Sequence, residues 1–222
     1  CEDLKNGLIR AVGEPEERFS EDALRILRAL RFAGRFDFQI ESATAEAIHR
    51  CREDLHRIAA ERVFAELKEL LVSPGCARLM LEFRDVFAVI LPEVEPLFDF
   101  DQNNPHHDSD GWHHTARTVA AVRPDVVLRL SALLHDTGKP DCKTRDEAGI
   151  SHFYGHNRRS KELAHAALLR LRCDNDTRLQ VETLVGMHDS PMPQTMAQTR
   201  RFLGKYGLEL TRKLLELRRA DV

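Results

Sequence analysis

Apolar residues recur at steps of three and four positions along almost the whole chain, and this spacing constrains its fold more than any other feature. Leu24, Leu27 and Leu30, for example, follow shortly after Ser20, a residue type that favours helix N-termini. The spacing places apolar side chains on one face of a helix and leaves another face to arginines. It predicts an all-α protein with helices at residues 21–32, 42–51, 59–71, 76–91, 111–122, 126–135, 160–172, 176–188, 196–205 and 208–222.

Breaks in this pattern predict two helical bundles. Residues 92–110 contain three prolines, several Asp and Asn residues and two adjacent histidines, a composition typical of a loop between helical units. We therefore expect a first bundle over residues 14–95 and a second over residues 96–222. Residues 1–13 are expected to be the tail of an element that begins upstream. A short hairpin is predicted at residues 143–154.

Composition and charge exclude several classes of protein. Of the 222 residues, 42% are apolar and 31% are charged, as in folded soluble proteins. The longest apolar run, residues 86–91, is far shorter than the roughly 20 residues that cross a bilayer, so no membrane partner is expected. Five widely spaced cysteines favour a reducing cytoplasm over a disulfide framework. The formal charge of −3 means that nucleic acid must be bound through a local basic face.

Several histidines and aspartates fall at the ends of apolar helix faces. One predicted helix ends in His135-Asp136, and the apolar stripes of two others continue onto His188 and Asp221. A buried carboxylate or imidazole is costly unless it is paired, and shared coordination of a metal ion is one way to satisfy several such groups. In the simpler alternatives, His188 is a hydrogen-bonded core histidine and Asp221 lies on a frayed helix end.

The order His, His-Asp, Asp over residues 111–222 resembles the HD superfamily of metal-dependent phosphohydrolases. The resemblance implies an HD domain that hydrolyses phosphoesters with a divalent metal: Mn, Ni, Co, Fe, Zn or Mg. It implies that Lys139 offsets charge on the phosphate, although an exposed loop lysine is an equal alternative. The implied metal ligands are His114, His135, Asp136, His156, His188 and Asp221, and the implied catalytic residues are His135, Asp136 and Lys139.

The first bundle carries a more specific resemblance. Residues 13–38 read GEPEERFSEDALRILRALRFAGRFDF and closely resemble the neck of bacterial tRNA nucleotidyltransferases, the CCA-adding and poly(A) polymerase family. The resemblance continues through residues 39–71 and in residues 101–106, which lead to Trp112 and His114. It implies a tRNA partner and the use of CTP and ATP to add or repair a 3′ CCA end. The choice between CCA and poly(A) addition stays open.

In that family a Glu-Asp-x-x-Arg element selects the incoming base, and here the element is Glu21-Asp22-x-x-Arg25. Residues three apart share a helix face, so Asp22 would accept from an exocyclic amine while Arg25 donates to the base edge. The resemblance thus implies Asp22 and Arg25 as nucleotide-binding residues and Arg28 as a phosphate contact. An ordinary surface ion pair between Asp22 and Arg25 is the alternative.

The catalytic head of that family, whose paired aspartates bind two Mg²⁺ ions, should precede residue 1. The chain contains no Gly-x-Asp-x-Asp pattern, begins with Cys1 and stops within an apolar stripe. We therefore expect a piece of a longer protein that does not add nucleotides by itself. Two other functions stay open: a free-standing HD phosphohydrolase acting on cyclic phosphates, nucleotides or phosphoesters, and a non-catalytic RNA-binding module whose HD residues only hold the fold together.

Overall fold

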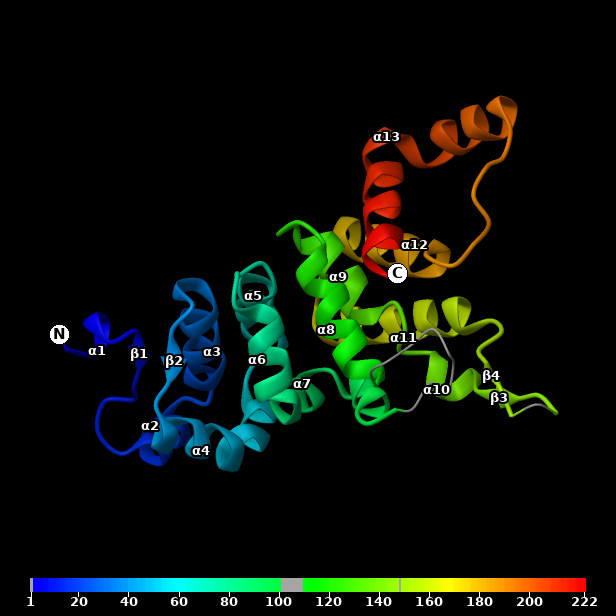
Figure 1. Cartoon of the computed structure of the whole chain (residues 1–222). Coiled ribbons are helices and arrows are strands. Elements are labelled where there is room, and N and C mark those ends of the chain that lie inside the picture. Colours follow the sequence, from blue (N-terminus) through cyan, green and yellow to red (C-terminus); the bar gives the residue numbers. More distant parts are fainter. Residues whose placement is uncertain (1, 101–109, 148) are drawn as a thin grey trace.

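The computed structural model describes residues 2–100, 110–147 and 149–222, and these are predominantly helical (Figure 1). The predicted all-α class is confirmed, since the described residues contain only two small two-stranded sheets. The first half consists of α1 (Glu2–Lys5), β1 (Leu8–Ile9), α2 (Pro15–Glu21), α3 (Leu24–Phe36), β2 (Gln39–Ile40), α4 (Ser42–Cys51), the 3₁₀-helix η1 (Arg52–Arg57), α5 (Ala60–Leu71), α6 (Cys76–Glu82), α7 (Arg84–Ile90) and the 3₁₀-helix η2 (Pro92–Leu97).

The second half is built around one buried helix, α9 (Val126–Leu134). Its neighbours are α8 (Gly111–Ala121), α11 (His156–Arg170), α12 (Asn175–Met187) and α13 (Met196–Ala220). Between α9 and α11 lie α10 (Lys139–Cys142), β3 (Thr144–Arg145) and β4 (Ser151–His152). Every residue of α9 from Val127 to Leu134 is buried, so this helix fixes the positions of the others. Among the described residues, none of the helices is long and apolar enough to span a membrane.

The helix predicted to start behind Ser20 is interrupted, and this part of the prediction is wrong. Ser20 lies inside α2, and the chain leaves the helical conformation at Asp22, where φ is −151° and ψ is 99°. The Asp22 carboxylate accepts a hydrogen bond from the Leu24 N–H at 3.1 Å. Such local bonds from an aspartate compete with a continuing helix, so α3 starts at Leu24.

A second predicted helix, residues 76–91, is also divided. The chain turns at Phe83, with φ at −117°, and separates α6 from α7. The Phe83 ring is fully buried and stacks on His49 at a centroid distance of 4.9 Å, so tertiary packing overrides the local pattern. The predicted break before residue 208 is confirmed by a kink at Gly207, where φ is 75°.

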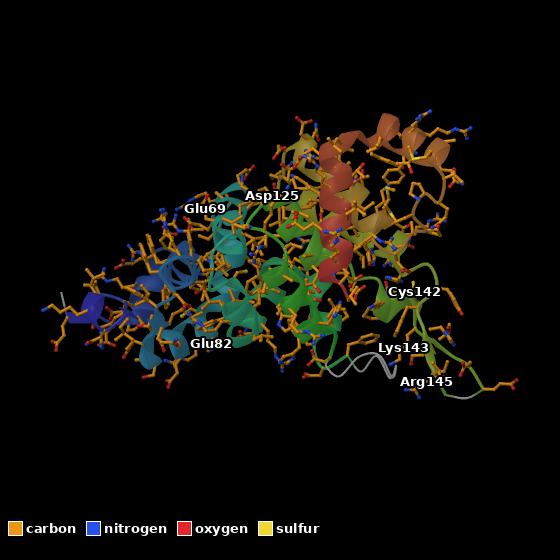
Figure 2. All side chains as sticks on the ribbon, turned by 45° about the horizontal axis from the view of Figure 1, so that its top comes forward. Glu69, Glu82, Asp125, Cys142, Lys143 and Arg145 are labelled. Carbon is orange, nitrogen blue, oxygen red and sulfur yellow. The ribbon has the colours of Figure 1, made fainter. Side chains whose placement is uncertain are left out.

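The predicted hairpin at residues 143–154 is confirmed, with Thr144 opposite His152 and Arg145 opposite Ser151. It projects from the helical body beyond α10, as the labelled Lys143 and Arg145 show (Figure 2). Helix α11 begins at His156, about one turn earlier than predicted. The sequence motif at residues 101–106 lies outside the described residues.

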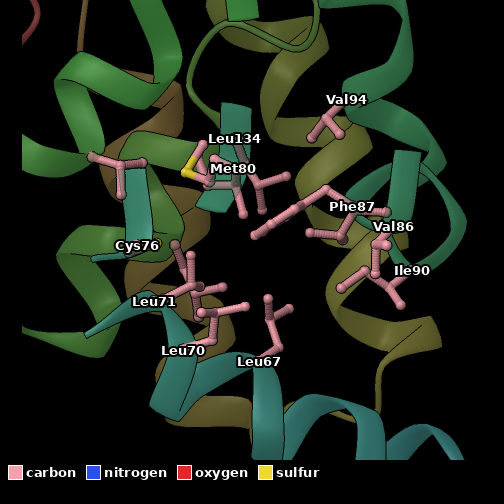
Figure 3. Close-up of a cluster of buried hydrophobic side chains, with 14 of the residues drawn as sticks. Leu67, Leu70, Leu71, Cys76, Met80, Val86, Phe87, Ile90, Val94 and Leu134 are labelled. Atoms are coloured by element: carbon pink, nitrogen blue, oxygen red, sulfur yellow. The ribbon is translucent and has the colours of Figure 1, made fainter. Parts of the chain in front are cut away.

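A continuous core joins the two halves of the chain. Figure 3 shows apolar side chains of α5, α6 and α7 gathered with Leu134 of α9. At the junction, Trp112 is buried and its Nε1–H donates to the Met80 carbonyl oxygen at 3.0 Å. The rings of Phe87 and Phe98 pack against the same indole at centroid distances of 5.9 and 5.0 Å. The first half is therefore packed directly on the second half, which carries the four histidines predicted to bind metal.

Two glycines allow the backbones of α3 and the turn before α6 to touch. The Gly75 N–H donates to the Gly34 carbonyl oxygen at 3.0 Å. A Cβ on Gly34 would overlap the Ser73 hydroxyl and lie 3.1 Å from Leu79 Cδ1. Only glycine fits this contact without a shift of the neighbouring turn.

We predict that Gly34→Ala lowers the free energy of unfolding by about 1–3 kcal/mol, because the turn at Ser73 must move to admit the methyl group. Gly204→Ala is the matched control: it lies in α13 with no atom within 4 Å of an added Cβ. That variant should gain up to about 1 kcal/mol from helix propensity. Urea unfolding measures both values, and equal stability of the two variants would contradict the close backbone contact.

Candidate metal centre and nucleotide-selecting face

His135 and His188 occupy the same local position at the ends of two helices. Each residue directly follows its helix, α9 or α12, and keeps helical backbone angles. His135 Nδ1 lies 2.7 Å from the Ala132 carbonyl oxygen, and His188 Nδ1 lies 2.7 Å from that of Val185. A carbonyl oxygen only accepts hydrogen bonds, so Nδ1 carries a proton in both rings. In the neutral rings, Nε2 is therefore the atom left to bind a ligand.

Four ligand atoms converge in a first group around Asp136. His135 Nε2 lies 3.3 Å from Asp136 Oδ2 and 2.9 Å from Asp221 Oδ1. His114 Nε2, from α8, lies 3.6 Å and 2.9 Å from the same two oxygens. One ligand atom from each residue lies within 4.8 Å of the others. The structure thus brings together His114, His135, Asp136 and Asp221, which are more than 100 residues apart at the extremes.

A second group shares the same carboxylate. Asp136 Oδ1 lies 3.6 Å from His156 Nε2 and 3.7 Å from His188 Nε2. The two Nε2 atoms are 3.0 Å apart, and His156 Nδ1 lies 2.9 Å from the Phe153 carbonyl oxygen. In the neutral rings, both Nε2 lone pairs would face each other and the carboxylate. A proton or a cation between them removes the repulsion, so the geometry fits a metal ion.

Asp136 is the more deeply buried of the two carboxylates of the site, at 1% side-chain exposure against 24% for Asp221. Its two oxygens face four histidine Nε2 atoms at 3.3–3.7 Å. Lys139 Nζ lies 2.6 Å from Oδ2. Burial acts to raise the pKa of Asp136, but His135 and Lys139 hold this pKa well below its usual value. An ionised buried carboxylate with open lone pairs suits a divalent cation.

Lys139 is itself buried, at 8% exposure, so the alternative of an exposed loop lysine is wrong.

The two histidines beside Asp136 differ in protonation. Burial acts to lower the pKa of His135, but the Asp136 and Asp221 carboxylates outweigh it and raise this pKa to about 10. In His188, burial and then the positive charge of His135 lower the pKa to about 4. Without a metal, the centre therefore holds a proton on His135 at neutral pH, while His188 is neutral.

Asp221 reaches the centre because ion pairs hold α13 against the start of α9. Lys213 Nζ is buried and lies 3.0 Å from Asp125 Oδ1 and 2.9 Å from Asp125 Oδ2. Arg123 Nη1 lies 2.9 Å from Glu216 Oε2. Helical spacing does not single out Lys213, because its partner is 88 residues away. Its place in an otherwise apolar stripe was the available signal.

Gly138 allows α11 to approach the turn that follows His135-Asp136. A Cβ at this position would lie 2.6 Å from both the His156 carbonyl oxygen and the Ser160 nitrogen. The Gly138 N–H donates to the Ser160 hydroxyl at 2.9 Å. This contact sets His156 beside Asp136. A cavity of about 390 Å³ opens next to the centre, lined by Asp136, Lys139, His156, His188, Asp221 and residues 151–155.

The predicted base-selecting residues lie where α2 gives way to α3. Asp22 precedes α3, so it does not share a helix face with Arg25 as the spacing predicted. Asp22 Oδ2 lies 3.2 Å from Arg62 Nη2, and Arg25 Nη1 lies 2.6 Å from Glu21 Oε2. Asp22 and Arg25 thus pair with other described residues rather than with each other, and the alternative of an ion pair between them is also wrong.

Arginines gather around a second cavity, of about 430 Å³, at this junction. Arg28 lines it and pairs with the buried Glu66, at 3.2 Å from Nε to Oε1. Arg25 and Arg28 were predicted from the sequence, whereas Arg10 and Arg18, which line the same cavity, were not. These two precede α3 in the chain, and no helical spacing links them to it. All four arginines also pair with carboxylates of this chain, so an anionic ligand in the cavity would share or displace these partners.

Comparisons with known proteins identify the family. The chain is 36% identical to the A-adding tRNA nucleotidyltransferase of Deinococcus radiodurans, over 99% of this chain and 53% of that protein. The chain belongs to the tRNA nucleotidyltransferase family. It is also 36% identical to the CC-adding tRNA nucleotidyltransferase of Thermus thermophilus, over 90% of this chain and 49% of that protein. The chain spans about half the length of these curated relatives.

Other comparisons agree with this family. Residues 37–98 match the family described as "Probable RNA and SrmB- binding site of polymerase A". Among solved structures, the fold resembles the Bacillus stearothermophilus CCA-adding enzyme in complex with CTP, with a TM-score of 0.64 at 24% identity. That likeness covers 99% of this chain and 47% of the other. The fold shared with a tRNA nucleotidyltransferase therefore extends over both helical halves.

We predict that divalent metal binding to this member of the family strengthens as the pH rises. His135, whose pKa is raised to about 10, must lose its proton before Nε2 can bind a metal. The apparent affinity should therefore rise about tenfold per pH unit between pH 7 and pH 9. Competition of Mn²⁺ against a chelator, corrected for the chelator's own titration, measures the slope. An affinity that does not change with pH would contradict a protonated His135 in the metal-free centre.

Proposed function

We propose that this chain is the neck, body and HD portion of an enzyme that adds or repairs the 3′ CCA end of tRNA with CTP and ATP. The 36% identity to the Deinococcus radiodurans enzyme over 99% of the chain carries this proposal. In it, residues 14–95 form the neck and body, and residues 96–222 form the HD domain. Residues 1–13 are the end of a head that binds Mg²⁺. The partner is tRNA, and the compartment is the cytoplasm.

Asp22 and Arg25 are proposed to select the base. Cytosine and adenine both present an exocyclic amine, from which a carboxylate accepts a hydrogen bond. Arg62, 3.2 Å from Oδ2, and the Leu24 N–H, 3.1 Å from Oδ1, support this role because they fix the Asp22 carboxylate, while each oxygen keeps a second lone pair that can accept from an amine. The four arginines that line the cavity at the junction of α2 and α3, Arg28 among them, would balance the negative charge of the triphosphate. The matched relatives include both an A-adding and a CC-adding enzyme, so both bases are proposed as substrates.

The second part of the proposal is phosphoester hydrolysis at the HD centre. The observation in its favour is that two groups of ligands share the single buried carboxylate of Asp136. Bound divalent metals would lower the pKa of a coordinated water and neutralise charge on a phosphate. Lys139 offsets part of the negative charge of Asp136, and the buried histidines keep bulk water away from the ligand atoms.

A free-standing phosphohydrolase is the second candidate. All six proposed ligands lie within residues 114–221, so the second half of the chain carries both ligand groups found among the described residues. The two candidates differ in the first half of the chain, because only a nucleotidyltransferase requires the arginines of the neck.

We predict that the purified chain, loaded with Mn²⁺, Co²⁺, Ni²⁺ or Fe²⁺, hydrolyses a 2′,3′-cyclic nucleotide. Asp136→Ala should lower kcat by at least about a hundredfold, because it removes a ligand common to both groups. His113→Ala is the matched control: this ring is exposed, neighbours His114 in α8 and pairs with Asp110 at 2.9 Å. It should keep metal binding and hydrolysis.

Metal content by mass spectrometry and a phosphodiesterase assay test this prediction together. A wild-type chain that binds none of these ions and stays inert with each of them would show that the HD residues only support the fold.

We predict that Asp22→Ala, in a polypeptide that includes the nucleotidyltransferase head, erodes the preference for CTP over UTP by about tenfold. UTP offers an oxygen where CTP offers an amine, and a lost or unpaired buried hydrogen bond costs about 1–3 kcal/mol. Asp54→Ala is the matched control, since this side chain has a similar exposure, 26% against 27%, and also pairs with an arginine. Incorporation ratios measure the effect. Unchanged selectivity in Asp22→Ala would exclude it from base recognition, whatever happens to tRNA binding.

A further inference from the structure

The hairpin of β3 and β4 forms one wall of the cavity beside the metal centre. Asp136 and Lys139 lie on the side of the ligands, and His152, Phe153 and Tyr154 line the same cavity from the hairpin. Its volume of about 390 Å³ falls within the range of small-molecule sites, about 300–1,000 Å³. The cavity is therefore large enough for more than a phosphate group.

The hairpin holds His152 in a fixed orientation. The strand register places His152 opposite Thr144, and its Nε2 lies 2.9 Å from Asp146 Oδ2. The rings of His152 and Tyr154 are stacked, with centroids 5.3 Å apart and planes 7° apart. One face of the Tyr154 ring is thus supported by an imidazole that is itself anchored.

Tyr154 has the most exposed aromatic side chain among the described residues, at 81%. Its neighbour Phe153 is packed instead: the ring lies 5.9 Å from that of Phe100, with Lys139 Nζ 5.7 Å from its centroid. Packing against neighbouring side chains therefore accounts for an aromatic residue at Phe153, but it does not account for the exposed aromatic ring of Tyr154. A flat aromatic ring that is braced on one face and open on the other, at the wall of a cavity, is suited to stacking on a planar ligand.

We infer that Tyr154, braced by His152, is the stacking surface for a planar ring, such as a nucleobase, of the ligand whose phosphate lies at the metal centre. The position of the phosphate at the metal centre rests on the proposed phosphohydrolase function. The stacking of a planar ring on Tyr154 rests on the geometry of the hairpin alone. Because every base has a π-face, the surface tolerates different bases and favours the larger purines.

The first test measures binding of adenosine, which has no phosphate, to the metal-free chain by NMR titration, with ribose as the base-free probe. Wild type should bind adenosine and not ribose. Tyr154→Ala should weaken adenosine binding by about tenfold, whereas Tyr154→Phe should restore it because the ring is kept. Tyr206→Ala, a change of the only other tyrosine of the chain, is the matched control and should bind as wild type. Wild-type affinity in Tyr154→Ala overturns the inference.

The second test separates this inference from the proposed function. With the metal-loaded chain, the ratio of kcat/KM for adenosine 2′-monophosphate to that for glycerol 2-phosphate should fall about tenfold in Tyr154→Ala, through KM. An equal fall for both substrates would mean a structural role and overturn the inference. If neither ester nor the 2′,3′-cyclic nucleotide is hydrolysed but adenosine binding still depends on Tyr154, the stacking surface stands and the proposed hydrolysis fails.

Discussion

The buried carboxylate of Asp136 is the constraint on which the second half of the molecule depends. An ionised group in this position is costly unless its partners compensate the charge, and the described residues supply the Lys139 ammonium, the protonated His135 ring and the Nε2 atoms of three further histidines. The helices that carry these partners must converge at one point, although they come from distant parts of the sequence. The packing of α8, α11, α12 and α13 around α9 is the arrangement that achieves this convergence.

Positioning depends on backbone geometry as much as on the ligands themselves. His135 and His188 each sit at a helix end, where a carbonyl three residues earlier orients the ring. Gly138 removes the side chain that would hold α11 away, and the Lys213–Asp125 ion pair fixes the helix that ends at Asp221. The hairpin adds a wall to the cavity, and its described residues belong to neither group of candidate metal ligands.

Helical spacing predicted much of this structure because burial and spacing are linked along a helix. The same logic identified His188 and Asp221 as inward-facing ends of apolar stripes. The helical spacing did not predict the break at Asp22, whose carboxylate accepts a hydrogen bond from a backbone N–H. It also did not predict the turn at Phe83, whose ring packs against His49 of another helix. It gave no partner for Lys213, since pairings between distant helices leave no local pattern. Asp22 and Arg25 of the neck were identified by their resemblance to a known family. Their ion-pair partners, Arg62 and Glu21, could be identified only from the folded structure.

The central claim is that Asp136 is shared between two metal-binding groups. Anomalous diffraction from crystals of this chain soaked in Mn²⁺ tests it most directly. We expect two anomalous peaks, one on each side of the Asp136 carboxylate, with His114, His135 and Asp221 at one and His156 and His188 at the other. Crystals with only one peak at Asp136, or with none, at a pH where His135 has lost its proton, would contradict a carboxylate shared by two metal ions.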